Sequence, residues 1–80
     1  MTEPSSRIFK IELDRATGSL ERVLGVARRR GLDLARLSVV ADGPSYQVRL
    51  EAGGASSEAN LALAQLNALI DVKRAVMEEL

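Results

Sequence analysis

Hydrophobic and polar residues alternate in the first part of the chain, over residues 7–13. One side of this segment carries three apolar residues: Phe9, Ile11 and Leu13. A period of two residues is typical of a β-strand with one buried face. We therefore predict a strand here, preceded by a disordered N-terminal tail over residues 1–6.

Between Gly18 and Gly31 the period changes to that of an α-helix. Four apolar residues recur there at spacings of three and four and are predicted to share one buried face: Leu20, Val23, Leu24 and Ala27. So short a helix is marginally stable by itself, because the free-energy cost of nucleation exceeds the stabilisation that about three helical turns contribute. Its apolar face is therefore expected to pack on a sheet.

Two further strand-like segments, residues 34–41 and 46–51, flank the turn-forming sequence of residues 42–45, Asp-Gly-Pro-Ser. A connection this short predicts an antiparallel hairpin. The apolar face of the first of these strands is expected to consist of Leu37, Val39 and Ala41.

A second helical pattern follows the small-residue loop of residues 52–57, where Ser56 or Ser57 is the expected helix cap. Its apolar face is predicted to consist of six residues: Ala59, Ala62, Leu63, Leu66, Leu69 and Ile70. The β-branched segment over residues 72–77 predicts a fourth strand, although its pattern does not indicate which side faces the core. Residues 78–80 are expected to form a C-terminal tail.

The predicted order, β-α-β-β-α-β, indicates a ferredoxin-like α+β fold, in which two helices cover one face of a four-stranded antiparallel sheet. Eighty residues suffice for one core, so we predict one domain over residues 7–77. The second strand lies at a sheet edge in this topology. Its free backbone groups, near Arg36 and Ser38, could pair with a second copy of the chain.

The residue inventory argues against catalysis. The chain contains no cysteine and no histidine, so the usual nucleophile–base pairs are missing. The carboxylates are scattered and show no metal-binding spacing. We therefore expect a protein that is not an enzyme and that holds no cofactor or metal of its own.

Charge and hydropathy narrow the class of partner. Eleven basic and eleven acidic residues cancel, which argues against a nucleic acid as the main partner. No apolar run approaches the roughly 18 residues that span a bilayer, and the first residues lack the apolar segment of a signal peptide. We expect a cytoplasmic protein that does not bind membranes.

Two segments carry a resemblance to a known family. Residues 18–34, Gly-Ser-Leu-Glu-Arg-Val-Leu-Gly-Val-Ala-Arg-Arg-Arg-Gly-Leu-Asp-Leu, resemble the signature of the ACT domain, in which a glycine and a leucine open a helix that ends at Arg-Gly. Residues 65–72, Gln-Leu-Asn-Ala-Leu-Ile-Asp-Val, are similar to a segment of acetolactate synthase small subunits. Together they resemble the short, single-ACT form found with isozyme II, over about residues 7 to 77.

The resemblance implies a non-catalytic regulatory subunit that binds and activates a large catalytic subunit. The catalytic subunit uses thiamine diphosphate, Mg²⁺ and FAD to condense pyruvate with a second 2-keto acid, which begins the biosynthesis of valine, leucine and isoleucine. The resemblance also implies a homodimer through the second strand and first helix, with one continuous eight-stranded sheet.

In responsive members of the family, valine binds at this dimer interface. The matching positions here are Arg15, Gly18, Ser19, Leu20, Asp33 and Leu34. Arg15 and Asp33 each replace an asparagine of the responsive members. The Asp33 carboxylate can only accept hydrogen bonds and would repel a ligand carboxylate, although it could hold the ammonium group while Arg15 held the carboxylate. We expect a weak or absent response to valine.

The sequence leaves a second interpretation open. A freestanding ACT-domain sensor or dimerisation module could bind a different amino acid and contact no synthase. If a catalytic subunit is the partner, the exposed candidates for its contact are Arg28, Arg36 and Arg49.

Overall fold

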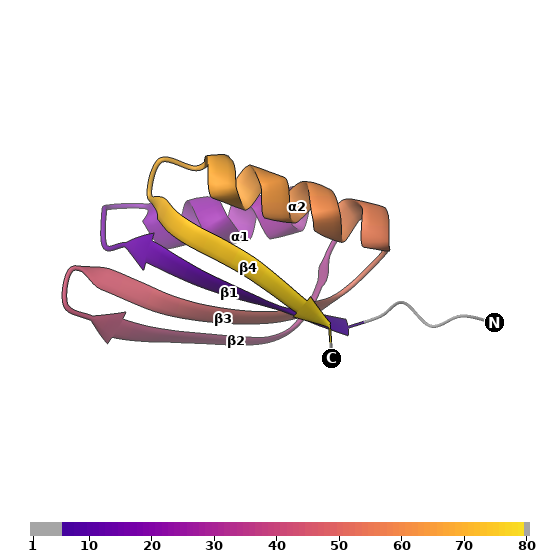
Figure 1. Ribbon diagram of the computed structural model, residues 1–80, viewed down its shortest axis with the longest axis horizontal. Helices are drawn as coiled ribbons and strands as arrows, with labels where there is room; N and C mark the ends of the chain where they lie inside the picture. Colours follow the sequence, from indigo (N-terminus) through magenta and orange to yellow (C-terminus); the bar gives the residue numbers. More distant parts are fainter. Residues whose placement is uncertain (1–5, 80) are drawn as a thin grey trace.

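The computed structural model describes residues 6–79, so the predictions for residues 1–5 and Leu80 lie outside the described part of the chain. The elements are β1 (Ser6–Asp14), α1 (Ser19–Arg29), β2 (Asp33–Asp42), β3 (Ser45–Gly53), α2 (Ser56–Ala68) and β4 (Val72–Glu79). The strands form one antiparallel sheet in the order β2-β3-β1-β4, and both helices cover the same face (Figure 1). The predicted ferredoxin-like fold is confirmed.

The core lies between the central strands and the helices. The predicted alternation of β1 is confirmed, because Phe9, Ile11 and Leu13 are each at most 2% exposed. Phe9 is aligned with Leu50 of β3, and Ile11 with Val48. These apolar cross-strand pairs give both helices one continuous surface to pack on.

A bulge decides which side of β4 faces the core. The register between β1 and β4 shifts between Glu12 and Leu13, which leaves Lys73 as the extra residue. Val72 and Ala75 are three positions apart, and both are buried. A regular strand would place them on opposite faces, so the bulge lets β4 contribute both residues to the core.

The strands at both chain ends are longer than predicted. Ser6, expected in the N-terminal tail, pairs with Gly53. Glu78 and Glu79, expected in the C-terminal tail, belong to β4, where Glu79 pairs with Arg7. Backbone pairing extends these strands although their side chains continue no apolar pattern.

The start of α2 differs from the prediction. Ala55 is the N-cap, and no side chain caps the helix, so neither predicted serine has that role. The Ser56 hydroxyl instead accepts a hydrogen bond of 2.6 Å from Nη2 of Arg7. Arg7 is only 3% exposed, and its Nη1 donates to the Gly54 carbonyl at 3.2 Å. This buried arginine connects β1 to the beginning of α2.

The end of α2 also differs. The helix ends at Ala68, and Leu69 has an extended backbone with φ −70° and ψ 135°. The next residue, Ile70, therefore leaves the helical face on which it was predicted and is 93% exposed. Ala59, Ala62 and Leu66 are buried as expected.

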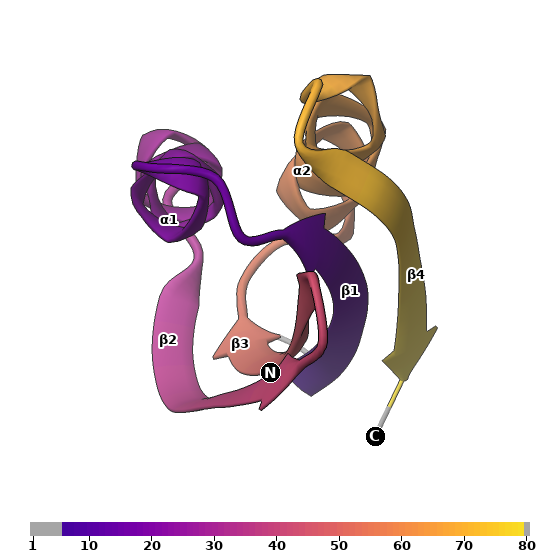
Figure 2. The same ribbon diagram turned by 90° about the vertical axis from the view of Figure 1, so that its left-hand side faces the viewer.

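The two helices cover different parts of the sheet. Figure 2 shows α1 on the side of β2, and α2 on the side of β1 and β4. The buried face of α1 is rotated from its prediction, since it includes Val23 and Ala27 but also Val26 and Ser19. Leu20 and Leu24 are only partly buried. Neither described helix is long and apolar enough to cross a membrane.

Candidate functional site

The edge strand β2 exposes an unusual amount of apolar surface. Leu34 is 44% exposed, Leu37 41% and Val40 58%. Leu37, Val39 and Ala41 share one face of the strand as predicted, opposite Leu50, Val48 and Tyr46 of β3, but Leu37 and Ala41 are exposed and Val39 is only partly buried. The sheet order contributes to the difference: β2 has a neighbouring strand on one side only, and Leu34 and Leu37 stay exposed although α1 lies on this side of the sheet.

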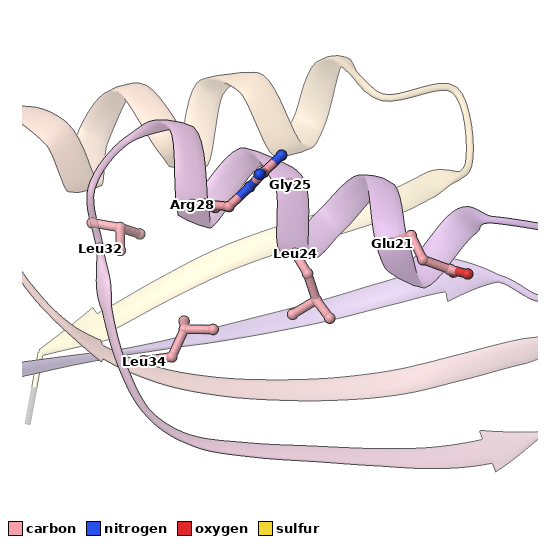
Figure 3. Close-up of a pocket in the computed structure, with 6 residues that line it drawn as sticks. All are labelled: Glu21, Leu24, Gly25, Arg28, Leu32 and Leu34. Carbon is pink, nitrogen blue, oxygen red and sulfur yellow. The ribbon is translucent and has the colours of Figure 1, made fainter.

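An opening of about 510 Å³ separates α1 from the first part of β2. Its lining residues are Glu21, Leu24, Gly25, Arg28, Leu32 and Leu34. Leu24 of the helix and Leu34 of the strand point towards the space between the two elements (Figure 3). The opening is therefore an apolar groove with charged side chains at its margin.

Most of these lining residues were not predicted as site residues, although one signal pointed to them. Gly25 lies inside α1, where glycine costs about 1 kcal/mol relative to alanine. A glycine in a helix interior indicates close approach of another group or a packing requirement. Because Gly25 has no side chain, it leaves space on the side of α1 that lines the groove.

The start of α1 is shaped by Gly18. This residue is the N-cap, with φ +76°, a left-handed conformation that glycine adopts without strain. No side chain caps the helix there. The Ser19 N–H donates to the Ala16 carbonyl at 3.0 Å, whereas the N–H groups of Leu20 and Glu21 have no acceptor within the helix. Together with the helix dipole, they favour a negatively charged group at this end.

An ion pair holds the loop that precedes α1 in place. Nε of Arg22 donates to Oδ2 of Asp71 at 2.7 Å, and Nη2 of the same side chain contacts the same oxygen. Nη2 also donates to the Thr17 carbonyl at 3.2 Å. A Cβ on Gly18 would lie 3.0 Å from Nη1 of Arg22. The glycine therefore provides both the backbone conformation and the room for this guanidinium.

The predicted effector residues form two groups in one chain. Gly18, Ser19 and Leu20 lie at the start of α1, whereas Asp33 and Leu34 begin β2, beyond the other end of that helix. An 11-residue helix is roughly 16 Å long. A ligand the size of an amino acid cannot span this distance. Both groups could contact one such ligand only if a second copy brought its own β2 close to Gly18.

Arg15, another predicted effector residue, is engaged within the chain, whereas Ser19 is buried. Nη1 of Arg15 donates to the Gly43 carbonyl at 3.2 Å, and its guanidinium lies 5.2 Å from the centre of the Tyr46 ring. Arg15 is thus held on the β2–β3 hairpin. Ser19 is 1% exposed, and its buried hydroxyl has no hydrogen-bond partner among the residues that the structure describes.

The two sheet edges differ in character. On β2, Arg36 and Ser38 are exposed, as expected for an edge strand, and they share this edge with the apolar residues described above. The β4 edge carries the Lys73 bulge and ends with Glu78 and Glu79. Bulges and charges discourage pairing with another strand, so β2 is the edge better suited to association.

Comparisons with known proteins identify the fold and its family. The sequence profile described as ACT domain matches residues 15–75. Compared with curated protein sequences, the chain shows no significant match. Among solved structures, the ACT domain from GTP pyrophosphokinase of Chlorobium tepidum is similar, with a TM-score of 0.81 and 10% identity over 94% of this chain and 99% of that one.

Two larger proteins contain a similar unit. A homoserine dehydrogenase from Thiobacillus denitrificans has a TM-score of 0.80 at 13% identity, over 94% of this chain but 17% of that one. The regulatory subunit of aspartate kinase from Thermus thermophilus has a TM-score of 0.69 at 17% identity, over 95% of this chain and 51% of that one. At these identities the likeness establishes the fold.

Proposed function

The chain belongs to the ACT domain family of regulatory, amino-acid-binding modules, and from this premise we propose that it is the small regulatory subunit of an acetolactate synthase. ACT domains are non-catalytic, so the proposed role is to bind and activate a separate catalytic chain. The thiamine diphosphate, Mg²⁺ and FAD of the reaction would then be held by that partner. The pathway served would be branched-chain amino-acid biosynthesis.

One observation carries the proposal. The two segments that resemble acetolactate synthase small subunits, residues 18–34 and 65–72, are far apart in sequence but meet in the fold. Arg22 of the first segment forms its ion pair with Asp71 of the second. The residues that carry the resemblance thus belong to one structural unit, which supports reading them together as one signature.

The exposed apolar surface supports the proposed homodimer. Leu34 and Leu37 face the same side of β2 as the helices, next to the groove beneath α1. Pairing of two β2 strands would extend the sheet across both copies and bury these side chains. It would also bring Asp33 of one copy towards Gly18 of the other, which one chain alone cannot do.

A weak or absent valine response is part of the proposal. The Arg15 side chain is held by Gly43 and Tyr46, and it would have to leave both to grip a ligand carboxylate. Asp33 is exposed and can only accept hydrogen bonds. At the start of α1 the Ser19 N–H donates to the Ala16 carbonyl at 3.0 Å, but the next N–H groups have no acceptor within the helix and could receive the carboxylate of another amino acid.

The proposal is tested by mixing the purified chain with the acetolactate synthase large subunit from the same genome. We expect a stable complex and a rise in synthase activity, with little change when valine is added. Failure to form a complex and to raise activity would overturn the proposal. Saturable binding of another amino acid in that case would support the freestanding sensor instead.

A further inference from the structure

The side of α1 that lines the groove carries two opposite charges. Glu21 and Arg28 are both exposed, and neither forms an ion pair with any residue that the structure describes. On a helix, opposite charges pair at spacings of three or four residues. None of the residues three or four positions from Glu21 or Arg28 is charged, so the helix offers neither side chain a partner.

Between these two charges lie Leu24 and Gly25, on the same face of the helix. Spacings of three, four and seven residues from Glu21 place all four side by side along the groove (Figure 3). Seven residues of helix separate Glu21 from Arg28 by roughly 10 Å, which is too far for an ion pair within one chain. This α1 stripe therefore presents a negative charge, an apolar side chain, a gap and a positive charge, in that order.

The order of the α1 stripe is complementary to itself when the helix is reversed. Two antiparallel copies of α1 that meet between Leu24 and Gly25 bring Glu21 of each copy opposite Arg28 of the other. The same register places Leu24 of each copy beside Gly25 of the other, where no side chain fills the space. One two-fold axis thus forms two ion pairs and two apolar contacts, as an isologous interface requires.

This two-fold axis also suits the edge of the sheet. α1 lies on the side of the sheet where β2 forms the edge (Figure 2). An axis normal to the sheet at this edge makes the two β2 strands antiparallel and the two α1 helices antiparallel. The exposed side chains of Leu34 and Leu37 would be covered by the same contact. A different protein would need the reversed charge order beside an edge strand, and a second copy of this chain has both.

We propose that the α1 stripe is the surface by which two copies of this chain select one another in an antiparallel register. This inference rests on the homodimer of the proposed function and deepens it. The β2 edge offers backbone groups that any strand can pair with, whereas the stripe determines which partner and which register are bound. It assigns Arg28 to the contact between copies, in place of the contact with a catalytic subunit that the sequence suggested.

The test reverses one charge in each of two full-length variants and measures dimerisation by sedimentation equilibrium. Glu21→Arg and Arg28→Glu should each dimerise about tenfold to a hundredfold more weakly than the wild type, because both ion pairs become repulsive contacts. An equimolar mixture of the two variants should recover the affinity of the wild type as a heterodimer, which native mass spectrometry identifies. Arg74→Glu, on β4 at the other edge of the sheet, is the control and should dimerise like the wild type.

A further variant tests the gap without changing the charge. Gly25→Ala should stabilise the helix, because alanine favours a helix interior more than glycine does. Its Cβ would meet only the flexible Nη1 of Arg29 within the chain, at 3.2 Å. In the dimer it would occupy the space for Leu24 of the other copy, so we expect weaker dimerisation of a more stable fold. Dimerisation equal to that of the wild type would overturn the placement of Leu24 beside Gly25.

The outcomes separate this inference from the proposed function. Recovery in the mixture would support the α1 stripe and would also show that both variants fold. If the wild type is a dimer and the reversals leave its affinity unchanged, the stripe is wrong and the homodimer stands. Variants that dimerise normally but lose binding to the large subunit would also overturn the inference, because the stripe would then belong to that partner. A monomeric wild type would overturn the stripe and the homodimer together, whereas its binding to the large subunit tests the regulatory role separately.

Discussion

Arg22 and Asp71 are 49 positions apart in the sequence, yet Nε of the arginine lies 2.7 Å from Oδ2 of the aspartate. The pair joins the first turn of α1 to the residue that precedes β4. Because Arg22 also donates to the Thr17 carbonyl, one guanidinium fixes both the loop before α1 and the turn after α2.

Removal of Asp71 should therefore destabilise the fold. Asp71 is 9% exposed, so Asp71→Ala leaves Arg22 without its main acceptor, and we expect a loss of about 1–3 kcal/mol in the free energy of unfolding. The control is Glu78→Ala, which breaks an exposed pair with Lys10 and should cost at most about 1 kcal/mol. Urea denaturation measures both. Equal stability of Asp71→Ala and the wild type would show that the pair is unimportant.

Gly18 should be sensitive to substitution for two separable reasons. Gly18→Ala imposes a left-handed conformation on alanine, at about 1–2 kcal/mol, and also crowds the Arg22 guanidinium. Gly31→Ala, with φ +69° and open space around its Cβ, carries only the first penalty. We expect Gly18→Ala to be the more destabilising change.

A double-mutant cycle isolates the second reason. In an Arg22→Ala background, the excess cost of Gly18→Ala over Gly31→Ala should disappear, as measured by urea denaturation. Persistence of the excess would mean that another neighbour, not Arg22, limits the space at Gly18.

The β2 surface should control self-association. Leu37→Asp places a charge in the proposed interface and is expected to convert the dimer to a monomer in light scattering. Leu61→Asp, on α2, should leave the dimer intact. A Leu37→Asp variant that remains dimeric would show that the chains associate elsewhere.

The replaced asparagines predict how a valine response could be introduced. Arg15→Asn combined with Asp33→Asn supplies two amide donors and removes the carboxylate that would repel the ligand. We expect the double variant to bind valine at least about tenfold more tightly than the wild type, which corresponds to about 1.4 kcal/mol. Isothermal titration calorimetry measures both affinities. Unchanged affinity would show that these positions do not determine the response.

The core could be predicted from local patterns because both of its faces come from this chain. The alternation of Phe9, Ile11 and Leu13 predicted the central strand, and the two helical patterns predicted the helices that pack on it. The resemblance also singled out Gly18, which the structure shows in a left-handed conformation at the N-cap of α1. The predicted effector residues remain in two groups, because a single chain does not bring them together.

Periodicity by itself determined the order of the elements and, through it, the fold. The same periodicity placed Leu37 on the apolar face of the second strand and Ile70 on the apolar face of the second helix, and both faces were expected to contribute to the core. Tertiary structure decided otherwise: the sheet order places β2 at an edge, and the extended backbone at Leu69 turns Ile70 away from α2. An apolar period indicates that a side chain favours burial, whereas the arrangement of the elements decides whether this chain or another must bury it.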